Sequence, residues 1–395
     1  MSDSTVNIAD RAKKIRSPKF GEIAEVRDLI AGQENVVNLG YGEPGFATPK
    51  HIRDAAKKAI DEGYTHYVLP VEGLTPLREA IAEKLSVRND INADPNGEIL
   101  VTAGVQEAIN VAFMTLVNPG DEVIIPEPYY YSHPLGVVLA GGLPVFTRLK
   151  EEMEFRIDPE DVRSKVSAKT KAIAFITPNC PTGAVFQRED LEEIVKIAIE
   201  HNLYVITDEV YENIIYDGQK HWSIASLPDA REYAVSMFGF SKAFAMTGWR
   251  IGYMTATREL IKNMVEIHGQ LTICTNSIAQ KAALEALTGD QACVEEMRDG
   301  YQERRNLFVT GLRELGFGCE LPKGSFYVYA NVSRWGWSGL DFAKHLAKEA
   351  KVLMYPGTAF TEHESGRNYV RFAYTRPIEE LQEALDRIGR IVTHL

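Results

Sequence analysis

The feature that most constrains this 395-residue chain is the stretch SKAFAMTGWRIGY, residues 241–253. It places Lys242 in a loop of small residues and Arg250 eight positions later, in a Thr-Gly-Trp turn. A hydrophobic run, LYVITDEVY at residues 203–211, comes shortly before and ends in acids and a tyrosine. Each residue alone is most simply a solvated lysine, a surface acid or a salt-bridged arginine. A shared binding site would be excluded only if all of these separate interpretations were true at once. We therefore favour one binding site that contains all of these residues.

These residue types together suit a phosphorylated aldehyde cofactor, pyridoxal phosphate. Lys242 offers the primary amine that an aldehyde needs to form a Schiff base. Asp208 stands where a buried strand should end, the usual position of ligand sites in open α/β sheets, and its carboxylate would keep a pyridine nitrogen protonated. Tyr211 can reach the 3-oxygen of the cofactor, and Arg250 presents an always-charged fork for the phosphate. We therefore predict a pyridoxal phosphate site in which Lys242, Asp208 and Tyr211 are catalytic.

The same phrases resemble the class I/II aminotransferases, the aspartate aminotransferase-like branch of the fold-type I pyridoxal-phosphate enzymes. The resemblance runs from NLGYGEPG (residues 38–45) to YVRFAYTRP (residues 369–377), nearly the whole chain. It implies an enzyme that moves an amino group from an L-amino acid to a 2-oxo acid with ping-pong kinetics. The acceptor implied by the resemblance is 2-oxoglutarate. It also implies a homodimer with shared active sites.

Two other classes of protein stay open. A pyridoxal-phosphate carbon–sulfur lyase can use the same lysine, acid and arginine, because the fate of the substrate carbanion depends on pocket details. A cofactor-sensing regulator usually carries a DNA-binding extension, and the N-terminal segment here is too short and the chain too acidic for one. The amino donor also stays open between aspartate, aromatic and small aliphatic amino acids, because no second arginine for a distal carboxylate can be placed.

The phrase TAGVQEA contributes a second phosphate-binding element. It places Gly104, Val105 and Gln106 at a predicted strand-to-helix turn, where unpaired backbone N–H groups and the helix dipole attract anions. Most such turns bind nothing, but the resembling family binds the cofactor phosphate at this turn. The resemblance adds Gly239 and Ser241, from the phrase GFSK, near the same phosphate.

Two further phrases depend on the resemblance for their interpretation. In EPYYYSHP, Tyr130 matches the aromatic residue that stacks on the pyridine ring. TPNCPTG resembles the family's NPTG turn, but Cys180 replaces the asparagine that donates to the cofactor's 3-oxygen, and Asn179 stands one place earlier. A thiol is a weak donor. Whether Asn179 or Cys180 contacts that oxygen stays open.

Substrate binding is predicted to rest on Arg371, inside the alternating apolar segment NYVRFAYT. A buried arginine is costly unless it is paired, either with a protein acid or with a bound carboxylate. The resemblance favours the α-carboxylate of the substrate and implies that Gly42 contacts the same group. It also implies that Tyr67 reaches the phosphate of the neighbouring subunit.

Composition limits where the protein works and what it binds. The net charge of −12 argues against nucleic acid and anionic membranes as partners. Four scattered cysteines without metal-like spacing favour a reducing compartment over a disulfide framework. The N-terminal segment lacks the apolar core of a signal peptide, and no apolar run is long enough to span a bilayer. We predict a soluble, cytoplasmic protein without bound metal.

Apolar runs alternate with helical patterns, which predicts an α/β fold with a mostly parallel sheet and crossover helices. A long helical stretch is predicted over residues 277–313, before a turn at residues 316–318. The resemblance implies a large cofactor-binding domain over residues 48–285. It implies a smaller α+β domain made of residues 1–47 and 286–395. Strands are predicted in segments 98–104, 121–126, 171–177, 203–208, 233–240 and 324–332, and helices at 106–117 and 339–350.

Overall fold

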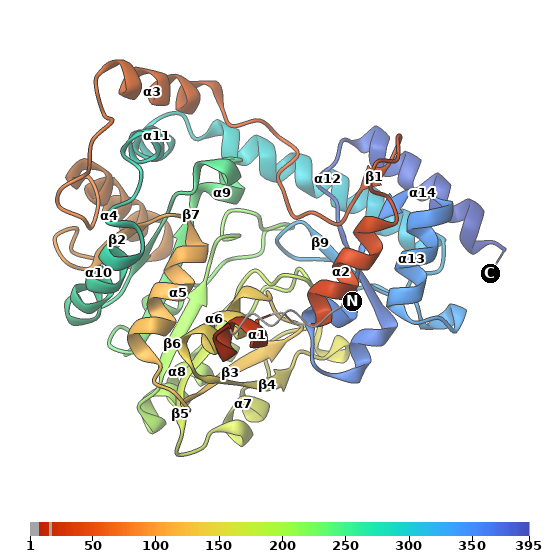
Figure 1. Cartoon of the computed structure of the whole chain (residues 1–395), viewed down its shortest axis with the longest axis horizontal. Coiled ribbons are helices and arrows are strands. Elements are labelled where there is room, and N and C mark those ends of the chain that lie inside the picture. Colours follow the sequence, from red (N-terminus) through yellow and green to blue (C-terminus); the bar gives the residue numbers. More distant parts are fainter. Residues whose placement is uncertain (1–7, 16–17, 395) are drawn as a thin grey trace.

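The computed structural model describes residues 8–15 and 18–394, and its centre is a seven-stranded sheet (Figure 1). The strand order is β2-β8-β7-β6-β5-β3-β4. Within this sheet β8 runs antiparallel to both neighbours, and all other pairs are parallel. The predicted α/β class with a mostly parallel sheet is therefore confirmed. The strands are β2 (Ile99–Thr102), β3 (Glu122–Glu127), β4 (Leu143–Arg148), β5 (Thr170–Ile176), β6 (Tyr204–Asp208), β7 (Ala234–Gly239) and β8 (Gly252–Thr255).

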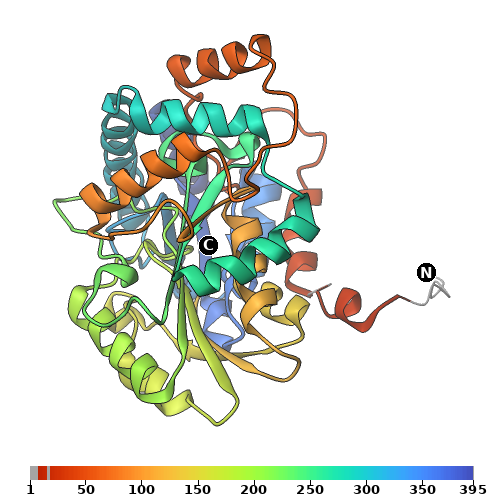
Figure 2. The same cartoon turned by 90° about the vertical axis from the view of Figure 1, so that its left-hand side faces the viewer.

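Helices cover both faces of this sheet, as Figure 2 shows. Because both faces are covered, the central strands are buried almost throughout and consist of continuous apolar runs rather than alternating patterns. One face carries α5 (Val105–Leu116), α6 (Ser132–Ala140) and α10 (Arg258–Thr272), and the other carries α7 (Pro159–Lys165) and α8 (Arg188–His201). Beside β2, α11 (Ser277–Thr288) packs against α3 (Lys50–Asp61) and α4 (Thr75–Asn89).

A second lobe combines the beginning and the end of the chain (Figure 1). Its antiparallel sheet has the order β11-β12-β9, and β1 pairs in parallel with β10. That pairing joins the N-terminal segment to the C-terminal part, whereas the domain boundaries at residues 48 and 285 stay a prediction. The elements are α2 (Pro18–Asp28), β1 (Val37–Asn38), α12 (Ala292–Glu314), β9 (Tyr327–Asn331), α13 (Gly339–Glu349), β10 (Val352–Leu353), β11 (Tyr355–Pro356), β12 (Tyr369–Ala373) and α14 (Ile378–Val392). The short helix that precedes them, α1 (Asp10–Lys14), packs against α6 of the large sheet.

The long helical stretch predicted over residues 277–313 is found, but it is interrupted. The structure has two helices there, α11 and α12, which are separated at Gly289. At this glycine the backbone leaves the helical region, with φ −83° and ψ −165°. The Asp290 side chain then accepts a hydrogen bond from the N–H of Ala292, at 2.9 Å, at the start of α12. The Gly-Asp pair therefore ends one helix and begins the next.

The other helices and strands predicted from the sequence are found in the described residues. Each segment predicted as a strand contains one, and the predicted helices at 106–117 and 339–350 correspond to α5 and α13. In the described part of the chain the four cysteines are free thiols, no cluster of metal-ligating side chains forms, and no helix has the length and apolarity to cross a membrane. Residues 1–7, part of the segment expected to lack a signal peptide, lie outside the described residues.

Candidate active site

A cavity of about 440 Å³ opens where the strands of the large sheet end and the second lobe begins. The carboxyl ends of parallel strands are the usual ligand side of such sheets. Lining residues come from the end of β5, from β6 and the segment after it, from the segment after β7, and from β9 and β12 of the other lobe. Ten residues predicted from the sequence line it: Gly42, Val105, Gln106, Tyr130, Asp208, Tyr211, Ser241, Lys242, Arg250 and Arg371.

Lys242 lies on α9 (Phe240–Ala243), the single helical turn that follows β7. Its Nζ donates a hydrogen bond to the carbonyl oxygen of Gly42, at 2.7 Å, and so reaches across to the other lobe. Although part of the side chain faces the cavity, burial lowers the pKa of Lys242 to about 8, and the charge of Arg371 acts in the same direction. A lysine of this kind presents a substantial fraction of neutral, nucleophilic amine near neutral pH.

Asp208 ends β6 and is almost fully buried. Burial raises the pKa of Asp208 to about 7, and the hydrogen bond that its Oδ1 accepts from the N–H of Val210, at 3.1 Å, offsets this only in part. A cationic ring nitrogen beside this carboxyl would bring its pKa back down and would itself stay protonated. The position therefore fits the pyridine nitrogen of the predicted cofactor.

His133 is a site residue that the sequence analysis missed. Its Nε2 lies 3.9 Å from Oδ2 of Asp208, and burial lowers its pKa to about 3, so the ring is neutral. Neither ring nitrogen has a hydrogen-bond partner among the described residues. A neutral N–H directed at Asp208 would favour the ionised carboxylate without adding charge. His133 stands three residues after Tyr130 in the same phrase, but no local pattern indicates its contact with β6.

Tyr327 is a second residue that the sequence analysis missed. Its hydroxyl oxygen lies 3.0 Å from that of Tyr211, which links the cofactor side of the cavity to β9. A Cβ atom at Gly42 would lie only 1.7 Å from the same Tyr327 hydroxyl, so no side chain fits at Gly42. The Gly42 backbone can consequently approach both Lys242 and any ligand that binds between them.

The predicted phosphate cradle combines the start of α5 with Arg250. Gly104 precedes α5 with φ +80°, and a Cβ atom there would lie 2.7 Å from Nη2 of Arg250. The guanidinium therefore stands directly over the helix N-terminus. Its Nη1 donates to the carbonyl oxygen of Thr247, at 2.9 Å, and no acid pairs with it among the described residues. Free N–H groups and an unpaired cation are what a phosphate requires.

Gly239 has a packing position rather than a place on the cavity wall. A Cβ atom at Gly239 would lie 2.8 Å from the side chain of Val105, so the glycine lets the end of β7 approach the phosphate turn closely. Tyr130, by contrast, lines the cavity, and its hydroxyl donates to Oε1 of Gln106 at 3.3 Å. Its position suits the predicted stacking on a flat ring, which stays a prediction.

The two candidate residues at the TPNCPTG turn, Asn179 and Cys180, have different protein contacts in the structure. The Oδ1 atom of Asn179 accepts from the backbone N–H and the hydroxyl of Thr182, at 3.1 and 2.8 Å, so this side chain holds the turn itself. The Cys180 thiol instead faces the substrate side, where Nη1 of Arg371 lies 3.8 Å from its sulfur. Neither side chain lines the Lys242 cavity, so which of the two residues contacts a ligand stays a prediction.

Arg371 lies on β12 and is 5% exposed. It donates to the carbonyl oxygen of Gly40, and the centre of its guanidinium lies 4.5 Å from the ring centroids of both Tyr327 and Phe360. Its Nε has no partner, and none of the described acids forms an ion pair with it. The alternative of an interior salt bridge is therefore not found in the described structure. A buried cation without a protein acid suits the predicted pairing with a ligand carboxylate, which stays a prediction.

Tyr67 does not reach the cavity of its own chain. Its side chain is 73% exposed, on the loop between α3 and α4. This position leaves it available to a neighbouring molecule, and its predicted contact with a partner's phosphate stays a prediction.

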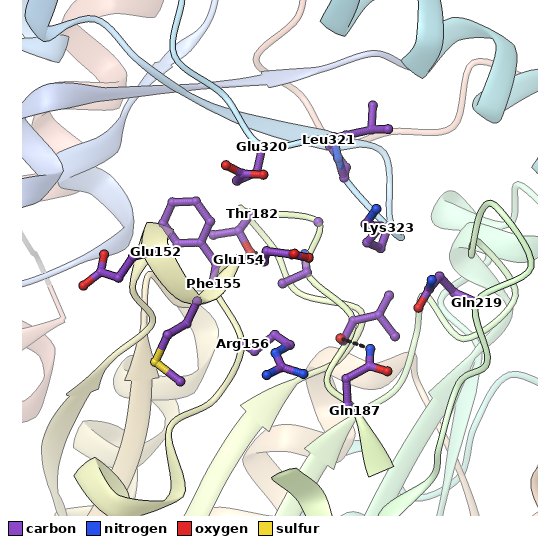
Figure 3. A pocket seen from close by; sticks show the side chains of 15 residues that line it. Glu152, Glu154, Phe155, Arg156, Thr182, Gln187, Gln219, Glu320, Leu321 and Lys323 are labelled. Atoms are coloured by element: carbon purple, nitrogen blue, oxygen red, sulfur yellow. Dashed lines mark hydrogen bonds between the residues drawn. The ribbon is translucent and has the colours of Figure 1, made fainter. Parts of the chain in front are cut away.

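A separate cavity, of about 510 Å³, lies where the two lobes meet beyond the TPNCPTG turn (Figure 3). The backbone joins the lobes there, because the carbonyl oxygen of Gly183 accepts from the N–H of Lys323 at 3.0 Å. Figure 3 shows Arg156 and Gln187 on one side and Glu320 on the opposite loop. None of the residues predicted from the sequence lines this cavity. It is larger than the Lys242 cavity but lacks the groups for the predicted chemistry.

Comparisons with known proteins agree with this geometry. The family model described as aminotransferase class I and II matches residues 34–388. The aromatic-amino-acid aminotransferase 2 of Thermococcus litoralis is 42% identical over 387 residues, which cover 98% of each chain. The aspartate aminotransferase of Pyrococcus abyssi is 44% identical and covers 94% of this chain and 95% of its own. A solved structure of Thermus thermophilus aspartate aminotransferase, a single mutant, is 38% identical with a TM-score of 0.91, covering 98% of this chain and 100% of its own.

Proposed function

This chain belongs to the class I and II aminotransferases, a family of enzymes that depend on pyridoxal phosphate, and from this premise we propose that the Lys242 cavity is its active site. The observation that carries the proposal is the position of Lys242. A partly neutral amine stands between an unpaired arginine at a helix N-terminus, Arg250, and an unpaired buried arginine, Arg371. One anion of the cofactor and one of the substrate would complete the site.

The residues of the cavity fit the cofactor group by group. Bound pyridoxal phosphate supplies an aldehyde that condenses with primary amines and a ring that withdraws electrons from the substrate. Arg250, Ser241 and the turn from Gly104 to Gln106 would hold its phosphate. Asp208, supported by His133, would hold the ring nitrogen in its protonated form. Tyr130 would cover one face of the ring, and Tyr211 would bind its 3-oxygen.

Substrate binding and proton movement follow from the remaining side chains. Arg371 would bind the α-carboxylate of an amino acid with two parallel hydrogen bonds, and the backbone at Gly42 would contact the same group. This orients the substrate Cα toward Nζ of Lys242. Since its pKa is near 8, Lys242 would take the Cα proton as a general base. As a general acid it would then deliver a proton to the carbon atom of the cofactor's aldehyde group.

The proposed acceptor is a 2-oxo acid, with 2-oxoglutarate the first to be tested. Two half-reactions at one site predict ping-pong kinetics, seen as parallel lines in double-reciprocal plots. The relatives described above are named as aminotransferases, so the carbon–sulfur lyase alternative is not favoured. Release of pyruvate and ammonia without an acceptor would be the mark of the lyase.

We further propose that the active enzyme is a homodimer. Tyr67 and Leu69 are 73% and 80% exposed, and the N–H of the intervening Val68 donates to the sulfur of Cys274 at 3.3 Å. Ile273, next to Cys274, is 51% exposed, so two neighbouring segments present large apolar side chains. Such a surface suits an isologous contact with a second copy. Light scattering at micromolar concentration tests this, and a monomeric mass would contradict it.

The proposed location of the enzyme is the cytoplasm. All four cysteines are free thiols in the structure, and Cys180 and Cys319 are buried. Free thiols persist in a reducing compartment. Cell fractionation tests the location, and recovery of the protein outside the cytoplasmic fraction would contradict it.

The central experiment labels and removes Lys242. Treatment of the pyridoxal-phosphate-loaded enzyme with borohydride should attach the cofactor to the peptide that contains Lys242. Lys242→Ala should lower kcat for amino transfer by about 10⁴-fold, because a general base and the amine that holds the cofactor are lost together. Lys323→Ala, at the other cavity, is the control and should keep normal turnover. Labelling elsewhere, or normal turnover of Lys242→Ala, would end the proposal.

A further inference from the structure

A buried acid that the proposed function does not use lies directly after Asp208. Glu209 is fully buried and does not line the Lys242 cavity, whereas Asp208 does. Its backbone N–H donates to the carbonyl oxygen of Met237 on β7, at 2.8 Å, so the pairing with β7 continues through this position. Because successive side chains of an extended segment point to opposite sides, Glu209 lies behind the carboxyl that is proposed to face the cofactor.

Three side chains hold the Glu209 carboxylate in place. Its Oε1 accepts a hydrogen bond from the hydroxyl of Thr207, at 2.8 Å. Its Oε2 accepts from Nε2 of His221, at 2.7 Å, and from the hydroxyl of Ser223, at 2.5 Å. Although burial favours the neutral acid, these hydrogen bonds hold the pKa of Glu209 below its ordinary value. Glu209 is therefore ionised at neutral pH.

The cations near Glu209 do not cancel its charge. The Nε2 atom of His221 carries a proton, because an ionised carboxylate can only accept. A second proton, on Nδ1, would have no acceptor, since this buried atom has no partner among the described residues. Lys84, which also interacts electrostatically with Glu209, is paired with Glu212, and Arg88 is exposed to water. The buried carboxylate therefore keeps a net negative charge.

This charge acts on the neighbouring carboxyl. Burial raises the pKa of Asp208, and the charge of Glu209 raises it further, because two buried negative charges on adjacent residues repel each other. A negative charge at this place opposes the loss of a proton from Asp208. It opposes in the same way the loss of a proton from a group that is hydrogen-bonded to Asp208.

We propose that Glu209 is a positioning residue that acts through Asp208, and that its buried charge retains one proton on Asp208 or on the group bound there. In the cofactor-free protein that proton lies on Asp208 itself. In the loaded enzyme it is shared between Asp208 and the ring nitrogen, and this part of the inference rests on the proposed function. Thr207, His221 and Ser223 serve to keep Glu209 ionised.

The variant Glu209→Gln removes the charge and can keep the hydrogen bonds. The amide oxygen can accept from His221 and Ser223, which both contact the same carboxylate oxygen. The amide N–H can donate to the hydroxyl of Thr207, whose own proton can turn to the hydroxyl of Ser236, 3.1 Å away. The side chain keeps its size, so a change in the behaviour of the protein reports the missing charge.

A double-mutant cycle between Glu209→Gln and Asp208→Asn measures the effect in the cofactor-free protein. At pH 8 we expect Asp208→Asn to lower the unfolding equilibrium constant by about ten-fold less in the Glu209→Gln background than in the wild type, which corresponds to about one pKa unit at Asp208. At pH 5 the folded protein holds Asp208 protonated in both backgrounds, so the coupling should be absent. Urea unfolding supplies the four equilibrium constants at each pH.

Two further variants separate charge from structure. Ser223→Ala removes one hydrogen bond and leaves the charge, so it should lower stability without any coupling to Asp208→Asn at either pH. His221→Lys places a fixed cation beside Glu209 and should give the same coupling as Glu209→Gln at pH 8. Absence of coupling for Glu209→Gln at pH 8, or an equal coupling for Ser223→Ala, would overturn the role of Glu209.

A spectroscopic measurement extends the test to the loaded enzyme. The NMR chemical shift of the ring nitrogen in isotope-labelled pyridoxal phosphate reports whether this nitrogen carries a proton. The nitrogen should lose its proton at a pH about one unit lower in Glu209→Gln than in the wild type or Ser223→Ala. An unchanged pH would overturn the inference for the cofactor. If the wild type transferred no amino group from any donor, the proposed function would fail, whereas the coupling measured without cofactor would stand.

Discussion

The two arginines that we propose to bind anions in this cavity are held in opposite ways. Arg250 is exposed, adopts a left-handed backbone conformation with φ +54°, and stands over the N-terminus of α5. Arg371 is buried in an antiparallel strand between aromatic rings. On the cofactor side, backbone N–H groups at the start of α5 would bind the anion together with Arg250. On the substrate side, the Arg371 side chain would bind the anion without such backbone groups. The cofactor side should therefore tolerate changes that the substrate side does not.

Asp208 offers a direct measure of how strongly the cofactor side depends on its ligand. The pKa of its carboxyl is about 7 in the folded protein and 3.8 in the unfolded chain. Because the folded state therefore binds the proton more tightly, the free energy of unfolding should fall as pH rises from about 4 to 7. Each pKa unit is worth about 1.4 kcal/mol, so Asp208→Asn should make the cofactor-free protein up to about 4 kcal/mol more stable at pH 8. Near pH 4 the difference should vanish.

Urea unfolding of the cofactor-free protein at pH 4, 6 and 8 measures this change. Asp299→Asn, at an exposed position, is the control and should differ little from the wild type at any pH. In the loaded enzyme the order should reverse, because the ring nitrogen then pairs with Asp208. A difference that does not vary with pH would contradict the burial of a titrating carboxyl.

Arg371→Lys tests the substrate side. A lysine keeps the charge but loses the fork, so KM should rise about 100-fold for every amino donor while the Kd for pyridoxal phosphate stays within two-fold. Steady-state kinetics and a cofactor titration supply the two values. The exposed Arg390→Lys is the control. A change in cofactor affinity with unaltered KM would reverse the assignment of the two arginines.

Arg250→Lys should give the complementary result with a smaller amplitude. Because the N–H groups at the start of α5 remain, the Kd for pyridoxal phosphate should rise about ten-fold. At saturating cofactor, KM for the amino donor should be unchanged. Fluorescence titration of the cofactor-free protein gives the Kd. If the donor KM rose instead, Arg250 would belong to the substrate side.

The smallest change is expected at the position between the two sides. Cys180→Asn would add a stronger donor near the cofactor's 3-oxygen, so the pH midpoint of the visible absorbance of the loaded enzyme should fall, by up to about 1 unit. Asn179→Ala should leave this midpoint in place and lower stability, because it removes the hydrogen bonds to Thr182. The opposite pattern would return the role to Asn179.

Local sequence was sufficient for the residues whose function depends on a turn or a strand end. Lys242 and Arg250 lie within one short phrase, and Asp208 ends an apolar run whose composition marks a buried strand. Their side chains meet in one cavity because parallel strands bring their carboxyl ends to the same edge. Their positions in the sequence, together with this rule of sheet topology, were therefore enough to predict that the three side chains share one cavity.

Contacts between distant segments could not be predicted in this way. His133 meets Asp208, and Tyr327 meets Tyr211, through packing between elements that are 75 and 116 residues apart. The interrupted helix at Gly289 was missed because apolar periodicity continues across the break. Arg27 also lines the cavity, and its helix α2 is brought there by the pairing of β1 with β10 and by packing against β11.

The sequence alone was sufficient to predict the α/β fold and a pyridoxal phosphate site with one amine, one acid and two arginines. It was sufficient because turns and strand ends are short-range features. Tertiary structure decided that the thiol of Cys180 and not the amide of Asn179 faces the substrate arginine, and that Arg27 joins it in the cavity. The physical reason is that side-chain direction and distant pairing follow from packing between the lobes, which no single segment specifies.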